Sequence, residues 1–238
     1  VRVELHLTTE QQAATRAMDE NCIRDVNLYL YGDTEYHFYF PSVSSPLVFN
    51  VLPGNYQSYA IANAGQDLGD KNAFEIQFYE TAVDVMESSD AIPMTDRGTL
   101  AVDGAGRCTP SSLRVTRSAA KIAYTIEVAD AVAPSLRLRS VQFCNLPLTI
   151  RPFDSGSISS TVEANYYDGE AMPVGNERRT AGTAYLFENL QGSVDTITDQ
   201  KDKCPENAPA CATYLRILAE RSADKALVEY IVYPGENN

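Results

Sequence analysis

The run DVNLYLY at residues 25–31 alternates strictly between two kinds of side chain. Val26, Leu28 and Leu30 would lie on one face of an extended chain, and an asparagine and two tyrosines would lie on the other. A period of two residues predicts a β-strand. The sequence LPGNY at residues 52–56 then supplies a Pro-Gly turn between two further apolar runs. These strand and turn signals are clearer than any catalytic motif in the chain.

Short apolar runs of the same kind recur along the chain, with turn-forming residues between them. Short strands that follow one another through turns indicate an antiparallel β-sandwich rather than βαβ units. We therefore predict a mostly β protein, with strands at 1–7, 23–31, 35–40, 47–52, 56–62, 98–102, 112–118, 119–129, 136–144, 183–188, 212–219 and 226–233.

Residues 72–86 form the one segment that favours a helix. Asp70 or Asn72 can cap its start, because either side chain accepts hydrogen bonds from the first backbone amides. We expect this short helix to cover one end of the first domain. Four apolar residues recur along it at helical spacing, namely Phe74, Phe78, Ala82 and Val85.

The length of 238 residues permits one large domain or two ordinary ones. The segment 129–134 consists mainly of small residues and ends in proline, which favours a domain boundary there. We predict an N-terminal domain at 1–132 and a C-terminal domain at 133–238. The polar region 151–182 is expected to be a functional excursion or a loop.

The composition is that of an acidic globular protein. Hydrophobic residues make up 44% of the chain and charged residues 21%, so a core can form. The formal net charge of -13 argues against a nucleic-acid partner, because no basic patch can neutralise phosphates. It also argues against charge-driven binding to anionic lipid. The sequence has no apolar run of roughly 18 residues, the length that a membrane-spanning helix needs.

Residues that could carry catalysis do not form a recognisable set. Neither His6 nor His37 has the partners of a metal site or a catalytic triad. Acidic groups could bind calcium or act as acid and base, but 32 acidic residues produce such groups by chance. We therefore expect no catalytic residue, no metal and no cofactor, and a protein that is not an enzyme. The acidic groups are Asp67 with Asp70, and Asp195 with Asp199 and Asp202.

The five cysteines are scattered and odd in number, which is not typical of a disulfide framework or a zinc site. Cys204 and Cys211 could be joined across the loop 205–209 in an oxidising compartment. Free thiols in or near a core are equally compatible with the sequence.

The chain has 14 tyrosines and no tryptophan. Exposed aromatic rings can stack on sugars, so Tyr166 and Tyr167 are candidate glycan contacts. Packing on half-buried strand faces is the simpler account of so many tyrosines. The glycan interpretation supports an alternative function, that of a surface glycan-binding β-sandwich module.

Several short segments of this chain are similar to segments of one known protein family, and they occur in the same order. In this order the chain resembles the FimB/Mfa2-type fimbrial anchor and accessory proteins of Bacteroidetes type V pili. The segments are TRA at 15–17, DVNLYLY at 25–31, LPGNY at 52–56, AIANAG at 60–65, RSAAKI at 117–122, VQFCNLP at 141–147, ENLQG at 188–192, AP at 208–209, ATYL at 212–215 and YPGEN at 233–237.

The resemblance implies two transthyretin-like antiparallel β-sandwich domains in an exported lipoprotein of the cell outer membrane. Such a protein would be a fimbrium (pilus) component, an anchor or an accessory or tip subunit, with a role in cell adhesion. Its partners would be other fimbrial subunits, bound through β-strand contacts. The implied N-terminal lipid anchor is absent from this chain, which opens on Val1, and we expect a further strand after Asn238.

In the wider superfamily, shaft subunits are cut after an arginine near the first strand, and a neighbour's strand refills the groove that opens. Carried over to this chain, the resemblance makes Arg16 a candidate processing site. It makes Val1, Val3, Leu5 and Leu7 the candidate donor-strand residues. An ordinary surface role for Arg16 is the alternative, and anchor-type members keep their first strand.

The segment DTI at 195–197 resembles the Asp-Ser/Thr-aliphatic sites at which Bacteroidetes attach O-glycans to exported proteins. On this basis Thr196 is a candidate O-glycosylation site.

Overall fold

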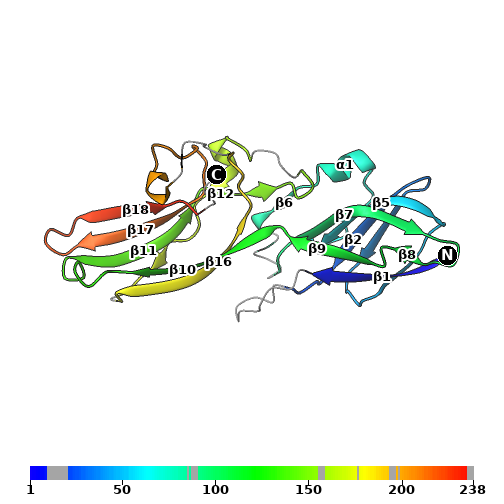
Figure 1. Ribbon diagram of the computed structural model, residues 1–238, viewed down its shortest axis with the longest axis horizontal. Helices are drawn as coiled ribbons and strands as arrows, with labels where there is room; N and C mark the ends of the chain where they lie inside the picture. The colour runs from blue at the N-terminus through cyan, green and yellow to red at the C-terminus, as the bar shows by residue number, and fades with distance from the viewer. Residues whose placement is uncertain are drawn as a thin grey trace. The chain divides into compact units, whose positions relative to one another are not determined.

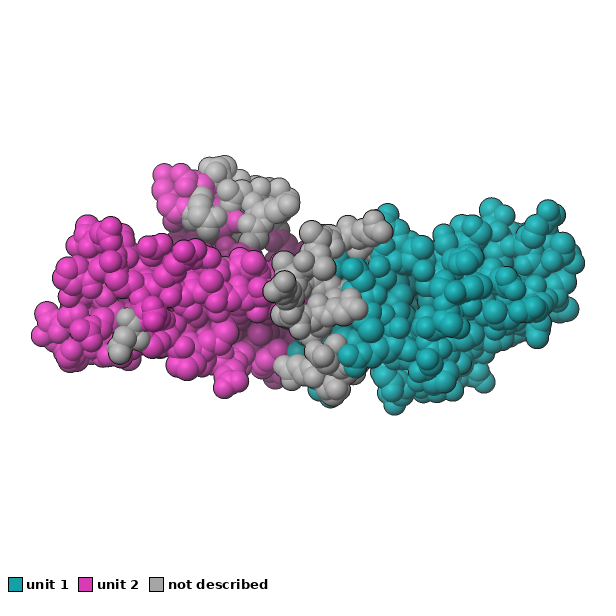
Figure 2. Space-filling model, turned by 90° about the horizontal axis from the view of Figure 1, so that it is seen from below, with its two compact units in different colours: residues 1–119, 149–155 teal, residues 120–148, 156–238 magenta. Residues whose placement is uncertain are grey.

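The computed structural model describes residues 1–9, 21–84, 86, 91–154, 159–175, 177–192, 197 and 199–234. The described chain is mostly β, as predicted (Figure 1). It forms two compact units, which Figure 2 shows in teal and magenta. Unit 1 contains Val1–Ala119 with Thr149–Ser155, and unit 2 contains Ala120–Leu148 with Gly156–Asn238.

Unit 1 is built around one sheet of eight strands. Among the described pairs of this sheet, only β1 and β9 run parallel, and the other pairs are antiparallel. From one edge to the other the strands are β3 (Tyr36–Phe40), β2 (Val26–Tyr31), β5 (Gly54–Ala62), β7 (Met94–Val102), β9 (Ser112–Arg117), β1 (Arg2–Thr9) and β4 (Leu47–Asn50), and β8 (Cys108–Thr109) pairs with β7.

The strand β2, which carries the alternating run, is buried on both faces. Val26 and Leu28 belong to the main core of unit 1. Tyr29 and Tyr31 belong to a second apolar cluster, which also includes Phe153. Their hydroxyls donate to backbone carbonyls of the segment that precedes α1, at 2.8 and 2.6 Å. The polar tips of these tyrosines are therefore satisfied, which allows the rings to be buried.

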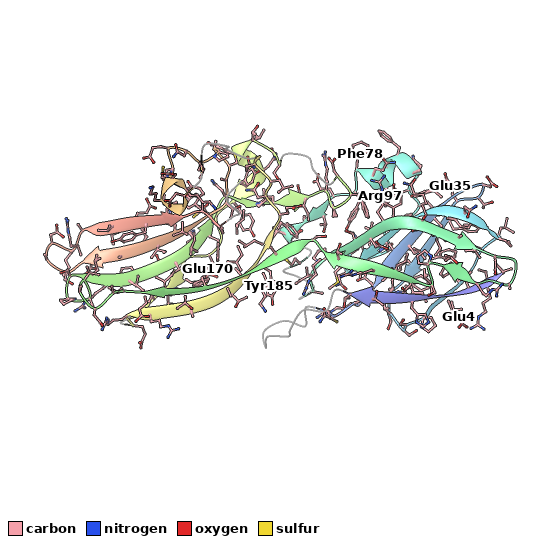
Figure 3. All side chains as sticks on the ribbon, viewed as in Figure 1. Glu4, Glu35, Phe78, Arg97, Glu170 and Tyr185 are labelled. Atoms are coloured by element: carbon pink, nitrogen blue, oxygen red, sulfur yellow. The ribbon has the colours of Figure 1, made fainter. Side chains whose placement is uncertain are left out.

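The helix α1 (Ala73–Gln77) is much shorter than predicted. Asn72 caps it as expected, because its side chain accepts hydrogen bonds from Phe74 N and Glu75 N. The predicted apolar stripe is wrong: Phe74 and Phe78 are 70% and 49% exposed, and the buried residue is Ile76. Phe78, which ends the helix, points away from the unit (Figure 3).

The helix ends at Gln77 because the chain enters a strand four residues later, at Thr81. The short β6 (Thr81–Ala82) pairs antiparallel with β13 (Thr149–Ile150). Ala82 therefore lies in a strand, and Val85 lies outside the described residues. A pairing with residues so distant in the sequence could not be read from local periodicity.

Unit 2 combines one four-stranded sheet with two small pairs. The sheet and the β10–β16 pair contribute to one apolar core, which contains Leu138, Val141, Phe143, Leu186 and Ile217. The sheet order is β15 (Met172–Pro173), β11 (Leu136–Cys144), β17 (Tyr214–Arg221) and β18 (Leu227–Val232); the pairs are β10 (Ala119–Glu127) with β16 (Arg179–Phe187), and β12 (Leu146–Pro147) with β14 (Tyr166–Tyr167).

The predicted domain boundary after residue 132 does not coincide with the division between the units. Strand β10 pairs with β16, so residues 120–132 belong to unit 2. Residues 149–155 belong to unit 1, because β13 pairs with β6 and Phe153 packs against Tyr59 with ring centroids 5.0 Å apart. The region 151–182 is not one loop, since it also contains β14, β15 and the 3₁₀ turn Glu163–Asn165.

Within the described part of the chain, no helix has the length and apolar character needed to cross a membrane.

Replacement of the helix cap tests whether α1 depends on its capping box. We expect Asn72→Ala to lower the free energy of unfolding by about 1 kcal/mol, because two backbone amides lose their acceptor. Phe74→Ala is the control, and it should change stability by less than about 0.5 kcal/mol because the ring is exposed. Urea unfolding measures both, and equal effects would contradict the prediction.

Candidate functional site

The first strand, β1, changes its hydrogen-bonding neighbour midway along its length. Its first half runs antiparallel to β4, from Arg2 opposite Asn50 to Leu5 opposite Leu47. Its second half runs parallel to β9, from His6 to Thr9. Among the described strands, β4 pairs with β1 alone. β1 therefore joins β4 to the rest of the sheet (Figure 1).

The side chains of β1 alternate as the sequence predicted. Val3 and Leu5 are fully buried and lie in the main core of unit 1, and Leu7 is half-buried against the same core. Val1 is 39% exposed, so it is not a core residue. The alternate residues point outward, and Figure 3 shows Glu4 on the outer side of the strand. β1 thus closes the core with one apolar face.

A turn at residues 103–107 fixes the start of β1. Gly106 has φ +80°, and a Cβ added to it would lie 2.1 Å from the carbonyl oxygen of Arg2. Asp103 shapes the turn by accepting hydrogen bonds from Ala105 N and Arg107 N, each at 2.9 Å. Those backbone bonds and the Arg107 side chain lower the pKa of the Asp103 carboxyl. Only glycine fits where this turn meets the strand.

Removing β1 would leave a groove in unit 1. Burial of Val3 and Leu5 stabilises the strand by about 1.5–3 kcal/mol for each side chain. Without the strand, the apolar side chains beneath would face water, and the facing backbone edges of β4 and β9 would lose their partners. A second extended segment with the same alternation could restore both kinds of interaction.

A dense hydrogen-bond network holds one end of unit 2 together. The amide nitrogen of Asn189 donates to the carbonyl of Cys211 at 2.8 Å and to Thr213 Oγ1 at 2.9 Å. Its amide oxygen accepts from Gln191 Nε2 at 2.7 Å. Thr213 Oγ1 in turn donates to the carbonyl of Asn145, at 2.8 Å. We call Asn145, Asn189, Gln191 and Thr213 the asparagine latch.

The latch brings together three segments that carry the family resemblance. Asn145 comes from VQFCNLP, Asn189 and Gln191 come from ENLQG, and Thr213 comes from ATYL. Asn145 has φ 54°, a left-handed conformation that asparagine tolerates better than most residues. The structure therefore gives these motifs a structural use that the sequence alone did not reveal.

Unit 1 has a similar group of hydrogen bonds where the start of β2 lies beside the end of β5. Asn63 also has a positive φ, 62°, and its side chain donates to the carbonyls of Cys22 and Ile92 at 2.9 and 2.7 Å. The buried Asp25 carboxylate accepts from Ala64 N and Gly65 N. Burial raises the pKa of Asp25, and these two backbone bonds oppose the rise.

The candidate glycan contacts are engaged inside unit 2. The hydroxyl of Tyr166 donates to the carbonyl of Ser160 and accepts from Gln191 Nε2, and burial raises its pKa. Tyr167 packs against the apolar core of the unit. Both residues are half-buried, and their role as glycan contacts stays a prediction.

Of the remaining candidate site residues, the structure describes the two cysteines but neither the processing site nor the glycosylation site. Cys204 and Cys211 are free thiols, and Cys211 is buried. Arg16 and Thr196 lie outside the described residues, so their roles stay predictions.

The histidines and acidic groups have structural surroundings. The His37 ring stacks on Tyr29 with centroids 4.4 Å apart, and its Nε2 lies 3.1 Å from Asn27 Oδ1. His6 is exposed on β1. Asp67 accepts a hydrogen bond from Gly69 N at 2.8 Å. In the described part of the chain, no group of three or more His, Cys, Asp and Glu side chains could hold a metal ion.

Comparison with known families and curated proteins finds one match, which covers only part of the chain. One family model, described as "Domain of unknown function (DUF4906)", matches residues 184–238. This match covers ENLQG and the strands β17 and β18 but less than half of the chain. No curated protein matches the chain.

Solved structures are more informative about the fold. A fimbrilin from Porphyromonas gingivalis W83 superposes with a TM-score of 0.61 at 14% identity, over 98% of this chain and 80% of that one. The fold of this chain is similar to that of a fimbrilin. A fimbrial assembly protein from Parabacteroides distasonis matches with a TM-score of 0.49 at 12% identity, over 98% of this chain and 86% of that one.

The turn at 103–107 gives a prediction about the attachment of β1. We expect Gly106→Ala to destabilise unit 1 by about 2 kcal/mol or more, because the new methyl group meets both a positive φ and the Arg2 carbonyl. Gly104→Ala is the matched control, since no atom lies within 4 Å of its added Cβ. Hydrogen exchange should show faster exchange of the β1 amides in the first variant only.

The asparagine latch gives a second prediction. We expect Asn189→Ala to cost about 2–3 kcal/mol, because several partly buried hydrogen bonds lose one partner. Leu190→Ala, a change at a side chain that is 42% exposed, should cost less than about 0.5 kcal/mol. Thermal unfolding with hydrogen exchange at β16 and β17 would measure both variants. An unchanged Asn189→Ala variant would show that the latch does not stabilise unit 2.

Proposed function

We propose that this chain is a structural component of a cell-surface fimbria, an anchor or an accessory or tip subunit, and that it binds other fimbrial subunits through β-strands. The observation that carries this proposal is the position of β1, which lies inside the sheet and closes the main core with Val3 and Leu5. A strand in that position can be replaced by another strand of the same pattern.

The fold supports the proposal. A fimbrilin is similar to this chain over 98% of its length. We infer that the two compact units are transthyretin-like β-sandwiches, antiparallel except for the β1–β9 pair of unit 1, and that the protein acts at the cell outer membrane. A lipid attached upstream of Val1 would anchor it there.

Whether the chain is cut after Arg16 would distinguish two modes of assembly. Arg16 lies between the end of β1 at Thr9 and the start of β2 at Val26. Cleavage there would leave β1 attached to unit 1 by noncovalent interactions alone, and a neighbour's strand could then replace it. An anchor would keep the peptide bond intact and would keep its own β1. We favour the anchor or accessory mode, because the sequence resembles that class.

A structural role also agrees with the surroundings of the polar residues. His37 and Asp67 are used in packing and in a turn, and Tyr166 is used in the hydrogen bonds around the latch. We infer that the protein is not an enzyme. No feature of the described residues favours the glycan-binding alternative over assembly by strands.

Cleavage followed by strand exchange tests the proposed mechanism. An arginine-specific protease should cut the chain after Arg16, and mass spectrometry should locate the cut. On gentle heating the cut protein should release its first strand and take up a labelled peptide of residues 1–9. A Leu5→Asp form of the peptide should bind at least about tenfold more weakly, because it places a charge in the core.

The Arg16→Ala protein is the control, because it should retain β1 and reject the labelled peptide. If the cut wild-type protein also keeps β1 and takes up no peptide, strand replacement is not its means of assembly. The N-terminus of the native protein from its cell envelope then distinguishes the modes. A lipidated terminus upstream of Val1 indicates an anchor, and a chain that begins at Ala17 indicates a polymerising subunit.

A further inference from the structure

The face of β2 that turns away from the main core binds the loop at residues 64–71, which leads from the end of β5 toward α1. We call residues 64–71 the helix-entry loop. Alternate side chains along the run DVNLYLY make hydrogen bonds of 2.6–3.1 Å to the backbone of this loop, and together they fix its course. The pairs are Asp25 with Ala64 N and Gly65 N, Asn27 with Gln66 O and Leu68 N, Tyr29 with Gly69 O, and Tyr31 with Lys71 O.

His37 lies beside this loop on the neighbouring strand β3, directly opposite Tyr29. Its ring stacks on the Tyr29 ring, with centroids 4.4 Å apart and ring planes 14° apart. The His37 side chain is 9% exposed. Packing therefore holds the imidazole in one place, and each of its two ring nitrogens lies close to an oxygen atom.

The hydrogen bonds of Asn27 determine which nitrogen of a neutral His37 ring carries the proton. Asn27 Nδ2 donates to Gln66 O, and Asn27 Oδ1 accepts from Leu68 N, each at 3.0 Å. These two bonds fix the orientation of the Asn27 amide. Its Oδ1 lies 3.1 Å from His37 Nε2, so Nε2 is the donor in that pair. The neutral ring therefore has its proton on Nε2 and a lone pair on Nδ1.

A second proton on the ring changes what Nδ1 offers to the loop. Nδ1 lies 3.6 Å from a carboxylate oxygen of Asp70. In the neutral ring the lone pair of Nδ1 faces this oxygen, and two acceptors repel each other. In the charged ring an N–H faces the oxygen, which gives a charge-assisted attraction. The Asp67 carboxylate, 3.7 Å from Nε2, is also attracted to the charged ring.

Titratable groups face the His37 ring from three elements. Asp67 and Asp70 face it from the loop, Tyr29 faces it from β2, and Tyr39 lies two residues further along β3 on the same face. Burial is the main cause that raises the pKa of both tyrosines, and the charge of Asp67 contributes to each rise. The tyrosines therefore stay uncharged near neutral pH, where a histidine gains or loses its proton.

We propose that His37 is a proton-operated clamp on the helix-entry loop. The charged ring holds the loop against β2 through Asp67 and Asp70, and the neutral ring lets the Asp70 end of the loop move away. Histidine changes its charge between about pH 5 and pH 8, so the clamp is closed at the acidic end of this range and is lost as the pH rises. The helix α1 starts directly after the loop, and its exposed Phe74 and Phe78 therefore lie on the part of unit 1 that the clamp holds (Figure 1).

Hydrogen exchange of the chain at about pH 5.5 and about pH 8 tests the clamp. The amides of Leu68 and Gly69 report on the loop, because they donate to Asn27 Oδ1 and Asp67 Oδ1. Each exchange rate is divided by the intrinsic rate at the same pH, which gives a protection factor. We expect the protection factors of these two amides to fall about two- to fivefold as the pH rises, the size of effect that partly exposed ion pairs produce.

A turn elsewhere in unit 1 supplies the internal control. Ala105 N and Arg107 N donate to the Asp103 carboxylate. Hydrogen bonds from the backbone and side chain of Arg107 lower the pKa of Asp103, so this carboxylate stays charged at both pH values. The protection factors of these two amides should therefore be the same at both.

Three variants identify the group that titrates. His37→Gln, which cannot gain a charge, should remove the pH dependence at Leu68 and Gly69. His6→Gln, at the other histidine of the chain, should retain it. Asp70→Asn should weaken it, because Nδ1 then faces a neutral amide. The Asp70 side chain is fully exposed, so this variant will fold even if His37→Gln does not.

Nuclear magnetic resonance of the imidazole nitrogens checks the assigned tautomer. At about pH 8 we expect the single ring proton of His37 on Nε2, next to Asn27 Oδ1. Four results would overturn the proposal: a neutral ring with its proton on Nδ1, no change of loop protection with pH, a pH dependence that His37→Gln retains, or an equal change at Ala105 and Arg107. A pH dependence that His37→Gln removes and His6→Gln retains supports the clamp.

Discussion

The fold of unit 1 depends on one strand that has two different neighbours. The first half of β1 pairs antiparallel with β4, and the second half pairs parallel with β9. Val3 and Leu5 then close the core from the same strand. Since β4 pairs with β1 alone among the described strands, the loss of β1 would detach β4 as well as open the core. Phe49, which is buried on β4, would lose its position in the same event.

The main strands could be predicted from the sequence because period-two alternation is a local signal. Residues 26–31, 36–40 and 136–144 form strands where the pattern placed them. What could not be predicted depends on distant partners. The helix ends at Gln77 because the chain soon pairs with residues near Ile150. The parallel arrangement of β1 and β9 was also missed, since alternation specifies a strand but not its direction.

The candidate site was predictable to a similar degree. The alternation of Val3 and Leu5 with polar residues indicated which face of β1 is buried, and the structure agrees. The latch residues Asn145 and Asn189 were visible only as parts of motifs, because the hydrogen bonds to Cys211 and Thr213 join residues more than twenty positions apart. For Asn145 the signal was an asparagine directly after the strand β11, where the chain takes a left-handed conformation. The hydrogen bonds of the Tyr166 hydroxyl to Ser160 and Gln191 could not be predicted either, because they depend on how the chain folds back on itself.

The partner change within β1 also has a mechanical consequence. Ladder hydrogen bonds lie across the strand axis, so a pull along β1 loads the bonds to β4 and β9 together, in shear. A pull at right angles to the strand would instead break them one at a time from an end. At its first residues β1 is also held by the Gly106 turn against the Arg2 carbonyl, so peeling from that end meets an additional contact. Unit 1 is therefore built to resist tension along its first strand more strongly than tension across it.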